Sequence, residues 1–272
     1  MDFYIIIALA AYVTGAFGYI GFLVKNDAFF RRMGSTFFTA GLIIQTLVVL
    51  SVLAGSGALP VANLRQSLGF SAWALALVFV FFEWRYKLAV LGAAAAPITA
   101  LTLLVSLFLP DTAAASPRLL KSAWTMLHVF PVFLGNASFV LAALVGGAYI
   151  LTERAIKNKK RGFFFRRMPP LDTLDRMGYA CVAVGFILLT TGLAAGFVYA
   201  KSVWGRWWSA DPKEVWSLVT WFLYAALIHE RLAVGWRGRR AAWMAIFGVA
   251  VMLFTFFGVN LLLSGHHRQF FG

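Results

Sequence analysis

The sequence predicts an all-α, polytopic membrane protein with about eight transmembrane helices. Of its 272 residues, 61% are hydrophobic and 12% are charged, and the mean hydropathy is +0.81. Apolar runs of about 20 residues, the length that crosses a bilayer as a helix, recur along the whole chain. Backbone groups in lipid must bond within the chain, and these runs are too long for barrel strands, so helices are the expected form.

Eight spans follow from the positions of these runs. They lie near residues 3–24, 37–55, 69–85, 88–109, 124–151, 177–200, 215–234 and 241–263. The first run begins with Asp2 and lacks a basic segment before it and a small-residue cleavage site after it. We therefore expect a retained helix there and no signal peptide. No soluble module interrupts the runs, and we expect residues 1–272 to form a single transmembrane domain.

Positive charge is distributed unevenly between the loops on the two sides of the expected membrane. The formal net charge is +14, from 24 Lys and Arg against 10 Asp and Glu. With an outside N-terminus, the inner loops contain 17 of the 24 basic residues. The remaining seven are Arg65, Arg118, Lys121, Lys201, Arg206, Lys213 and Arg268. The positive-inside rule therefore predicts both termini on the outer, periplasmic face. No nucleic-acid role is needed to explain the charge, and the basic run at 154–167 suits anionic lipid headgroups.

Several chemistries are excluded by what the sequence lacks. Cys181 is the single cysteine and lies inside the sixth span, so thiol–disulfide exchange and a cysteine metal cage are excluded as functions of this chain. Neither a Walker loop nor a GxGxxG motif after a strand is present, and nothing indicates ATP hydrolysis.

A tryptophan-rich segment, residues 201–216, connects the sixth and seventh spans. It contains Trp204, Trp207, Trp208 and Trp216, the cations Arg206 and Lys213, and the carboxylates Asp211 and Glu214. Tryptophan is costly to expose without partners for its ring and N–H, and an interfacial aromatic belt would spread such rings over several helix ends. We expect an apolar platform with a cationic edge, suited to a planar anion such as a porphyrin with its propionates. The two carboxylates are expected to order the loop, and the helix dipole favours Glu214 where the next span starts.

Histidine is uncommon in membrane spans and marks candidate sites there. His128 falls near the start of the fifth span, and His266 and His267 follow the eighth. The predicted topology places all three at the outer boundary, level with the tryptophan-rich segment. Two neutral imidazoles that face each other can hold haem iron as axial ligands. Each histidine alone is equally well explained as an interfacial or solvated residue, and their convergence with the tryptophans favours a site.

His229 is predicted at a different depth. It comes 15 residues after Glu214, which at 1.5 Å per residue places it roughly 22 Å below the tryptophan-rich segment in a core of ~30 Å. It either makes a hydrogen bond near the inner interface, beside Glu230 and Arg231, or binds a second haem closer to the cytoplasm. No second histidine of this chain lies at that depth, so the other ligand would come from another chain, from a methionine, or be missing.

At this point the chain resembles a known family. The segment from Trp204 to His229, WGRWWSADPKEVWSLVTWFLYAALIH, is similar to the tryptophan-rich signature of haem-handling cytochrome c assembly proteins. Its Asp-Pro-Lys-Glu form is most like the CcsA/ResC branch. The ending GVNLLLSGHH, residues 258–267, resembles that branch's Gly-Val-Asn…Ser-Gly-Leu-His pattern. The resemblance covers roughly residues 70–270.

The resemblance implies a haem-binding membrane subunit of a cytochrome c synthetase, and hence a candidate haem lyase subunit. Such a protein carries haem b to the outer face and presents it for covalent attachment to apocytochrome c. The positions implied to contact haem are His128, His229, His267, Trp204, Trp207, Trp208, Asp211, Arg206 and Lys213, with the three histidines as iron ligands. A CcsB/ResB-like membrane partner is implied for the second in-membrane ligand. We expect a bacterial inner (plasma) membrane in preference to a thylakoid membrane.

Two positions depart from the family pattern. The family usually has Trp-Asp where this chain has Ala210-Asp211, so one ring of the expected platform is missing. His266 stands where the family has Leu, which leaves two adjacent candidates for the outer ligand, and position favours His267. Two other functions stay open: a HemX-like haem-binding accessory or regulatory protein, and an exporter of an amphipathic anion with the tryptophans as its outer gate.

Overall fold

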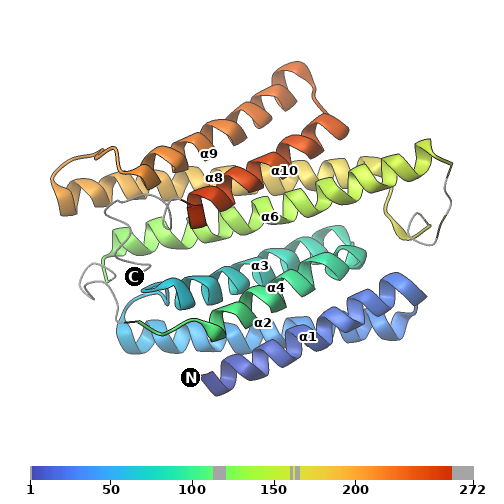
Figure 1. Cartoon of the computed structure of the whole chain (residues 1–272), viewed down its shortest axis with the longest axis horizontal. Helices are drawn as coiled ribbons and strands as arrows, with labels where there is room; N and C mark the ends of the chain where they lie inside the picture. Colours follow the sequence, from blue (N-terminus) through green and yellow to red (C-terminus); the bar gives the residue numbers. More distant parts are fainter. Residues whose placement is uncertain (1, 113–120, 160–161, 163–165, 259–272) are drawn as a thin grey trace.

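In the computed structural model, which describes residues 2–112, 121–159, 162 and 166–258, the chain is built from long helices (Figure 1). Their bounds are α1 Asp2–Lys25, α2 Ala28–Ser56, α3 Leu64–Tyr86, η1 Ala89–Leu91, α4 Gly92–Phe108, α6 Ala123–Lys157, α8 Leu171–Trp204, α9 Pro212–His229, η2 Glu230–Val234, α10 Arg239–Leu253 and η3 Phe254–Gly258. No strand occurs in these residues, so the prediction of an all-α membrane fold is confirmed.

Within the described residues, seven of the predicted spans form helices that are long and apolar enough to cross a membrane. The eighth, α9, is 18 residues long, but its mean hydropathy falls short of theirs. The reason lies in its ends, where Lys213, Glu214 and His229 replace apolar residues. We therefore expect α9 to cross the bilayer only when it is packed against its neighbours in the bundle.

Some helices are longer than the sequence predicted. We expected the second span to begin near residue 37, but α2 begins at Ala28. Asp27 caps this start, because its carboxylate accepts a hydrogen bond of 2.7 Å from the backbone N–H of Phe29. Arg31 and Arg32, which we had assigned to a loop, lie in the first turns of the helix. The predicted end of the last span at residue 263 lies outside the described residues.

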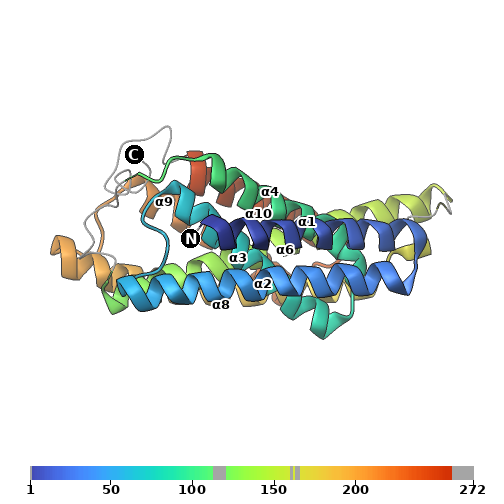
Figure 2. The same cartoon turned by 90° about the horizontal axis from the view of Figure 1, so that it is seen from below.

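The long helices of the described part of the chain lie in two groups side by side, α1–α4 in one and α6, α8, α9 and α10 in the other (Figures 1 and 2). The groups meet where α3 packs on α6. There the ring of Phe70 lies 5.1 Å from that of Phe133, and the ring of Trp73 lies 5.9 Å from that of Phe130. In the second group, α6 runs along α8 and α10, while α9 lies against α8 and α10.

Polar side chains inside the first group bond one another across helices. The Tyr12 hydroxyl of α1 donates to Gln45 Oε1 of α2 over 2.8 Å, and Gln45 Nε2 donates to the Gly69 carbonyl oxygen of α3 over 2.9 Å. A buried amide without partners would destabilise the fold, so this chain of bonds makes the placement of α1, α2 and α3 specific.

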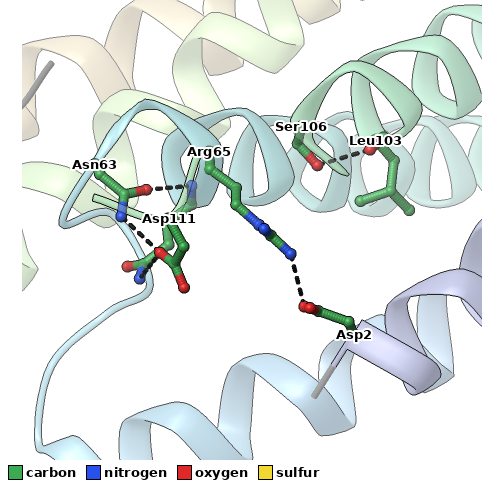
Figure 3. Close-up of polar contacts among 7 residues, drawn as sticks. Asp2, Asn63, Arg65, Leu103, Ser106 and Asp111 are labelled. Carbon is green, nitrogen blue, oxygen red and sulfur yellow. Dashed lines mark hydrogen bonds and ion pairs between the residues drawn. The ribbon is translucent and has the colours of Figure 1, made fainter. Parts of the chain in front are cut away.

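The helix ends form two chemically different faces. The tryptophan end carries the start of α1 and the loop between α8 and α9. Figure 3 shows two contacts there: Arg65 bonds Asp2 over 2.7 Å, and Asn63, which caps α3, donates to Asp111 over 2.8 Å. The basic end is the opposite one, where α1 turns into α2 and α9 turns into α10 (Figure 1).

Basic side chains are concentrated at the basic end. Those described there are Lys25, Arg31, Arg32, Arg85, Lys87, Arg154, Lys157, Lys159, Arg166, Arg167, Arg176, Arg231, Arg237, Arg239 and Arg240. The described cations at the tryptophan end are Arg65, Lys121, Lys201, Arg206 and Lys213. The described basic residues thus gather at the helix ends that the sequence placed on one side, and the positive-inside rule predicts that the basic end faces the cytoplasm.

This orientation predicts the outcome of reporter fusions. Fusions after Lys87 and Arg237 should be active as cytoplasmic reporters, and fusions after Gly57 and Pro110 should be active as periplasmic reporters. The reverse pattern would place the tryptophan end in the cytoplasm and contradict the assignment.

Candidate functional site

The tryptophan-rich segment folds as a short loop, residues 205–211, that turns sharply at both ends. Gly205 ends α8 with a φ of 73°, a left-handed conformation that suits glycine. Lys201 Nζ donates to the Gly205 carbonyl oxygen over 2.9 Å. Ala210, just before α9, has a φ of 56°, which costs a residue with a Cβ on the order of 1 kcal/mol.

Asp211 and Glu214 form a capping box at the start of α9. The Asp211 carboxylate is buried and accepts a hydrogen bond of 2.9 Å from the backbone N–H of Lys213. Glu214 Oε2 accepts from the backbone N–H of Ser209 over 2.9 Å and of Asp211 over 3.4 Å. A helix start leaves its first N–H groups without helical partners, and Asp211 accepts one of these, while Glu214 accepts the N–H groups of the N-cap residue and of the loop before it. The prediction that the two acids order the loop is confirmed.

The tryptophan rings fall into two pairs. Trp204 lies edge-on to Tyr199 of α8, with centroids 6.2 Å apart, and Trp216 packs edge-on against the start of η3. Trp207 and Trp208 are 56% and 39% exposed. Two rings are thus packed on the bundle, and two present apolar surface outward.

His128 lies between α6 and α8 near the tryptophan end. Its Nδ1 is 2.7 Å from the Gly192 carbonyl oxygen of α8. Because a carbonyl oxygen can only accept, this bond places the ring proton on Nδ1 and the lone pair of the neutral ring on Nε2. Gly196, one turn further along α8, lies directly against the ring. A backbone carbonyl that fixes the tautomer in this way is typical of histidines that bind a metal.

The loop folds back to the level of His128. The Trp208 ring has its centroid 6.2 Å from that of Phe197, and Phe197 directly follows Gly196. Consecutive helical residues are separated by only 1.5 Å along the axis and by 100° around it. Trp208 and His128 thus contact α8 at adjacent residues, Phe197 and Gly196.

Two cations flank this region. Arg206 is exposed in the loop, and Lys213 is half-buried in the first turn of α9, before the apolar part of that helix. Burial lowers the pKa of Lys213 to about 8, and the neighbouring Asp211 carboxylate opposes that shift. Below pH 8 the ammonium group keeps its charge, so both side chains can meet an anionic group.

His229 is not part of this arrangement. It is the last residue of α9, and its side chain is exposed at the basic end of the molecule, as its predicted depth required. The structure therefore separates His229 from His128, and the two cannot bind the same iron. The predicted ligands His266 and His267 lie outside the described residues.

Comparison with known proteins now adds to this geometry. The model of the cytochrome C assembly protein family matches residues 61–267. The chain belongs to this family. A protein of Prochlorococcus marinus (strain MIT 9312) named cytochrome c biogenesis protein CcsA is 35% identical to this chain, over 91% of this chain and 87% of the relative. A protein of the same name from Guillardia theta is 33% identical, over 88% of this chain and 87% of the relative. This cytochrome c assembly protein is thus a multi-pass membrane protein.

A solved structure shows the same fold. The chain aligns with a protein titled "Cytochrome c Heme Lyase CcmF" with a TM-score of 0.66 and 18% identity. The alignment covers 99% of this chain and 48% of that one, so the assembly protein spans about half the length of its structural neighbour. At this identity the likeness concerns the fold alone.

Sequence analysis missed the residues that hold His128. Gly192 and Gly196 are spaced four apart in the sixth span, a pattern that lets a second helix approach closely. That spacing, together with a histidine in the neighbouring span, was the available signal. The partner of Arg231, Asp175 of α8, was missed as well, because a contact across 56 residues leaves no local pattern.

The glycine contact predicts the effect of adding one methyl group. A Cβ at Gly196 would lie 2.7 Å from His128 Nδ1, so Gly196→Ala should push the ring away from the Gly192 carbonyl. Loss of such a supporting bond typically lowers metal affinity about tenfold or more, and haem retention measured by absorbance should fall accordingly. Gly178→Ala on the same helix is the control, because its Cβ would make an ordinary contact of 3.5 Å with Val145.

Proposed function

We propose that this chain is the haem-binding membrane subunit of a cytochrome c synthetase. It carries haem to the outer face and presents it for covalent attachment to apocytochrome c. The observation that carries the proposal is the position of His128, whose Nδ1 bonds the Gly192 carbonyl and whose ring packs on Gly196, the residue before the Trp208 contact Phe197. Membership of the cytochrome c assembly family and the CcsA relatives support it.

The residues around the loop fit haem b as the cargo. His128 offers an imidazole Nε2 as one axial ligand, and Trp207 and Trp208 offer ring faces to the macrocycle. Arg206 and Lys213 supply positive charge for the propionates. Ser209 Oγ is buried and has no hydrogen-bond partner in the part of the chain that the structure describes, which leaves a polar group for a ligand.

In this role the chain contributes positioning more than acid–base chemistry. The apocytochrome brings the cysteine thiols of a CxxCH motif, and each thiol adds across a haem vinyl group, with the S–H proton passing to a vinyl carbon. The loop holds the porphyrin edge outward, and the imidazole fixes the iron, so the two reactants meet in a defined orientation.

The remaining assignments belong to the same proposal. His267 supplies the second outer ligand, and His229 supplies one ligand of a second haem that a CcsB/ResB-like partner completes. The tryptophan end faces the periplasm across a bacterial inner membrane, with anionic lipids at the basic end. A thylakoid membrane is the second candidate, because the relatives include proteins of Prochlorococcus marinus and Guillardia theta. The comparisons do not favour an accessory, regulatory or export role.

The outer site predicts imidazole rescue. His128→Ala or His267→Ala should strongly reduce cytochrome maturation and haem retention, and added imidazole should restore part of both by filling the open axial position. His266→Leu should leave both unchanged. If His266→Leu abolishes maturation while His267→Ala does not, the outer ligand is His266.

The inner site predicts an effect that needs the partner. Co-expression with a CcsB-like protein should increase haem per complex, measured by the pyridine haemochrome assay, because the partner supplies the missing ligand. His229→Ala should remove that increase and leave haem at the outer site. Unchanged haem content in the His229→Ala complex would show that His229 is not a ligand.

A further inference from the structure

The chain makes a tight turn immediately after His229, and one carboxylate on another helix holds it. The turn consists of the π-helix η2, residues Glu230–Val234, and the residues that lead to α10. Asp175 of α8 accepts two bonds from Arg231 of η2, of 2.9 and 2.7 Å, and one of 2.7 Å from the Gly238 backbone N–H. A single carboxylate therefore joins α8, η2 and the start of α10.

Arg231 is held on its other sides as well. Its guanidinium lies 4.9 Å from the centroid of the Tyr179 ring, and its Nη1 donates to the Trp236 carbonyl oxygen over 3.4 Å. The side chains of Arg231 and Asp175 are only 11% and 10% exposed. A planar guanidinium that makes two parallel bonds to a carboxylate fixes orientation as well as distance.

This ion pair sets the rotation of the end of α9. Side chains two residues apart in a helix point to nearly opposite sides. Arg231 points into the bundle toward α8, whereas His229 is exposed. Arg231 itself belongs to the π-helical turn that follows α9, a form common at functional sites. While the pair is intact, the imidazole is held away from the chain's own core.

His229 shares its outward face with a stripe of exposed residues. Val215, Val219, Phe222 and Ala226 precede it at helical spacing, and all are exposed. Ala226 lies one turn before His229, and because its side chain is small, no bulky group protrudes from the helix beside the imidazole. A flat ring bound to His229 can therefore approach the helix closely on this face.

We propose that Asp175 and Arg231 are positioning residues that present His229 to haem on the outward face of α9. The inference rests on the proposed role of His229 as a haem ligand and extends it to the residues that orient the ring. It identifies α9's outward face as the surface where the inner haem lies.

The test compares two acidic residues on the same helix. Asp175→Asn keeps the shape of the side chain but removes the charged acceptor for Arg231. Asp172→Asn makes the same change three residues earlier, in an exposed ion pair with Arg176 of the same helix. Both changes are made in the full-length chain with His128→Ala, so that added haem reports on His229, and affinity is measured by absorbance titration of the complex with the CcsB-like partner.

We expect Asp175→Asn to lower the affinity for haem tenfold or more and to lower the low-spin fraction in the absorbance spectrum. We expect Asp172→Asn to change neither quantity. Added imidazole should restore the low-spin spectrum in Asp175→Asn, since it replaces a displaced ring but cannot restore an unfolded bundle. Equal affinities of Asp175→Asn and Asp172→Asn would overturn the proposal. So would a loss that imidazole does not restore.

A second measurement needs no haem. A nitroxide label at Ala226→Cys, in a chain with Cys181→Ala, reports the mobility of the end of α9 by electron paramagnetic resonance. Mobility should rise with Asp175→Asn and stay unchanged with Asp172→Asn; unchanged mobility in both would contradict the positioning role. The proposed function is tested separately, because His229→Ala alone decides whether this residue binds haem.

Discussion

The close packing of α6 on α8 is the contact on which the rest of the structure depends. Where the two helices meet near the tryptophan end, Gly192 and Gly196 remove the Cβ atoms that would keep His128 out. The same helix ends in Trp204 and thereby sets where the loop begins. The pair α6 and α8 thus determines the position and the tautomer of the His128 imidazole, and α8 also provides Phe197, on which Trp208 packs.

Polar side chains inside the molecule are few, and they join helices that are distant in sequence. Tyr12 bonds Gln45 within the first group of helices, Tyr19 donates to Glu83 over 2.5 Å, and Asp175 bonds Arg231 in the second group. In a membrane, apolar surfaces gain little from facing each other in place of lipid, so hydrogen bonds and close packing decide which helices pair. These contacts make the arrangement specific.

The sequence predicted the parts of the fold that follow from local composition. Apolar runs predicted each of the long helices in the part of the chain that the structure describes, and basic loops predicted which helix ends lie on the same side. The capping role of Asp211 and Glu214 followed from their spacing. Helix ends were less predictable, because Asp27 extends α2 through two arginines that composition alone assigned to a loop. The bond between His128 and Gly192 and the pair of Asp175 with Arg231 join positions 64 and 56 residues apart, and only the packed structure reveals them.

The low hydropathy of α9 has a consequence for how the protein is made. A segment with Lys213 and Glu214 at one end and His229 at the other partitions poorly from the translocon into lipid by itself. In the finished fold Trp221 bonds Thr190 of α8 over 2.9 Å, and α10 packs alongside. We therefore expect the helix that starts at the tryptophan loop to be integrated stably once α10 has been synthesised, and the loop to acquire its final shape only after that step.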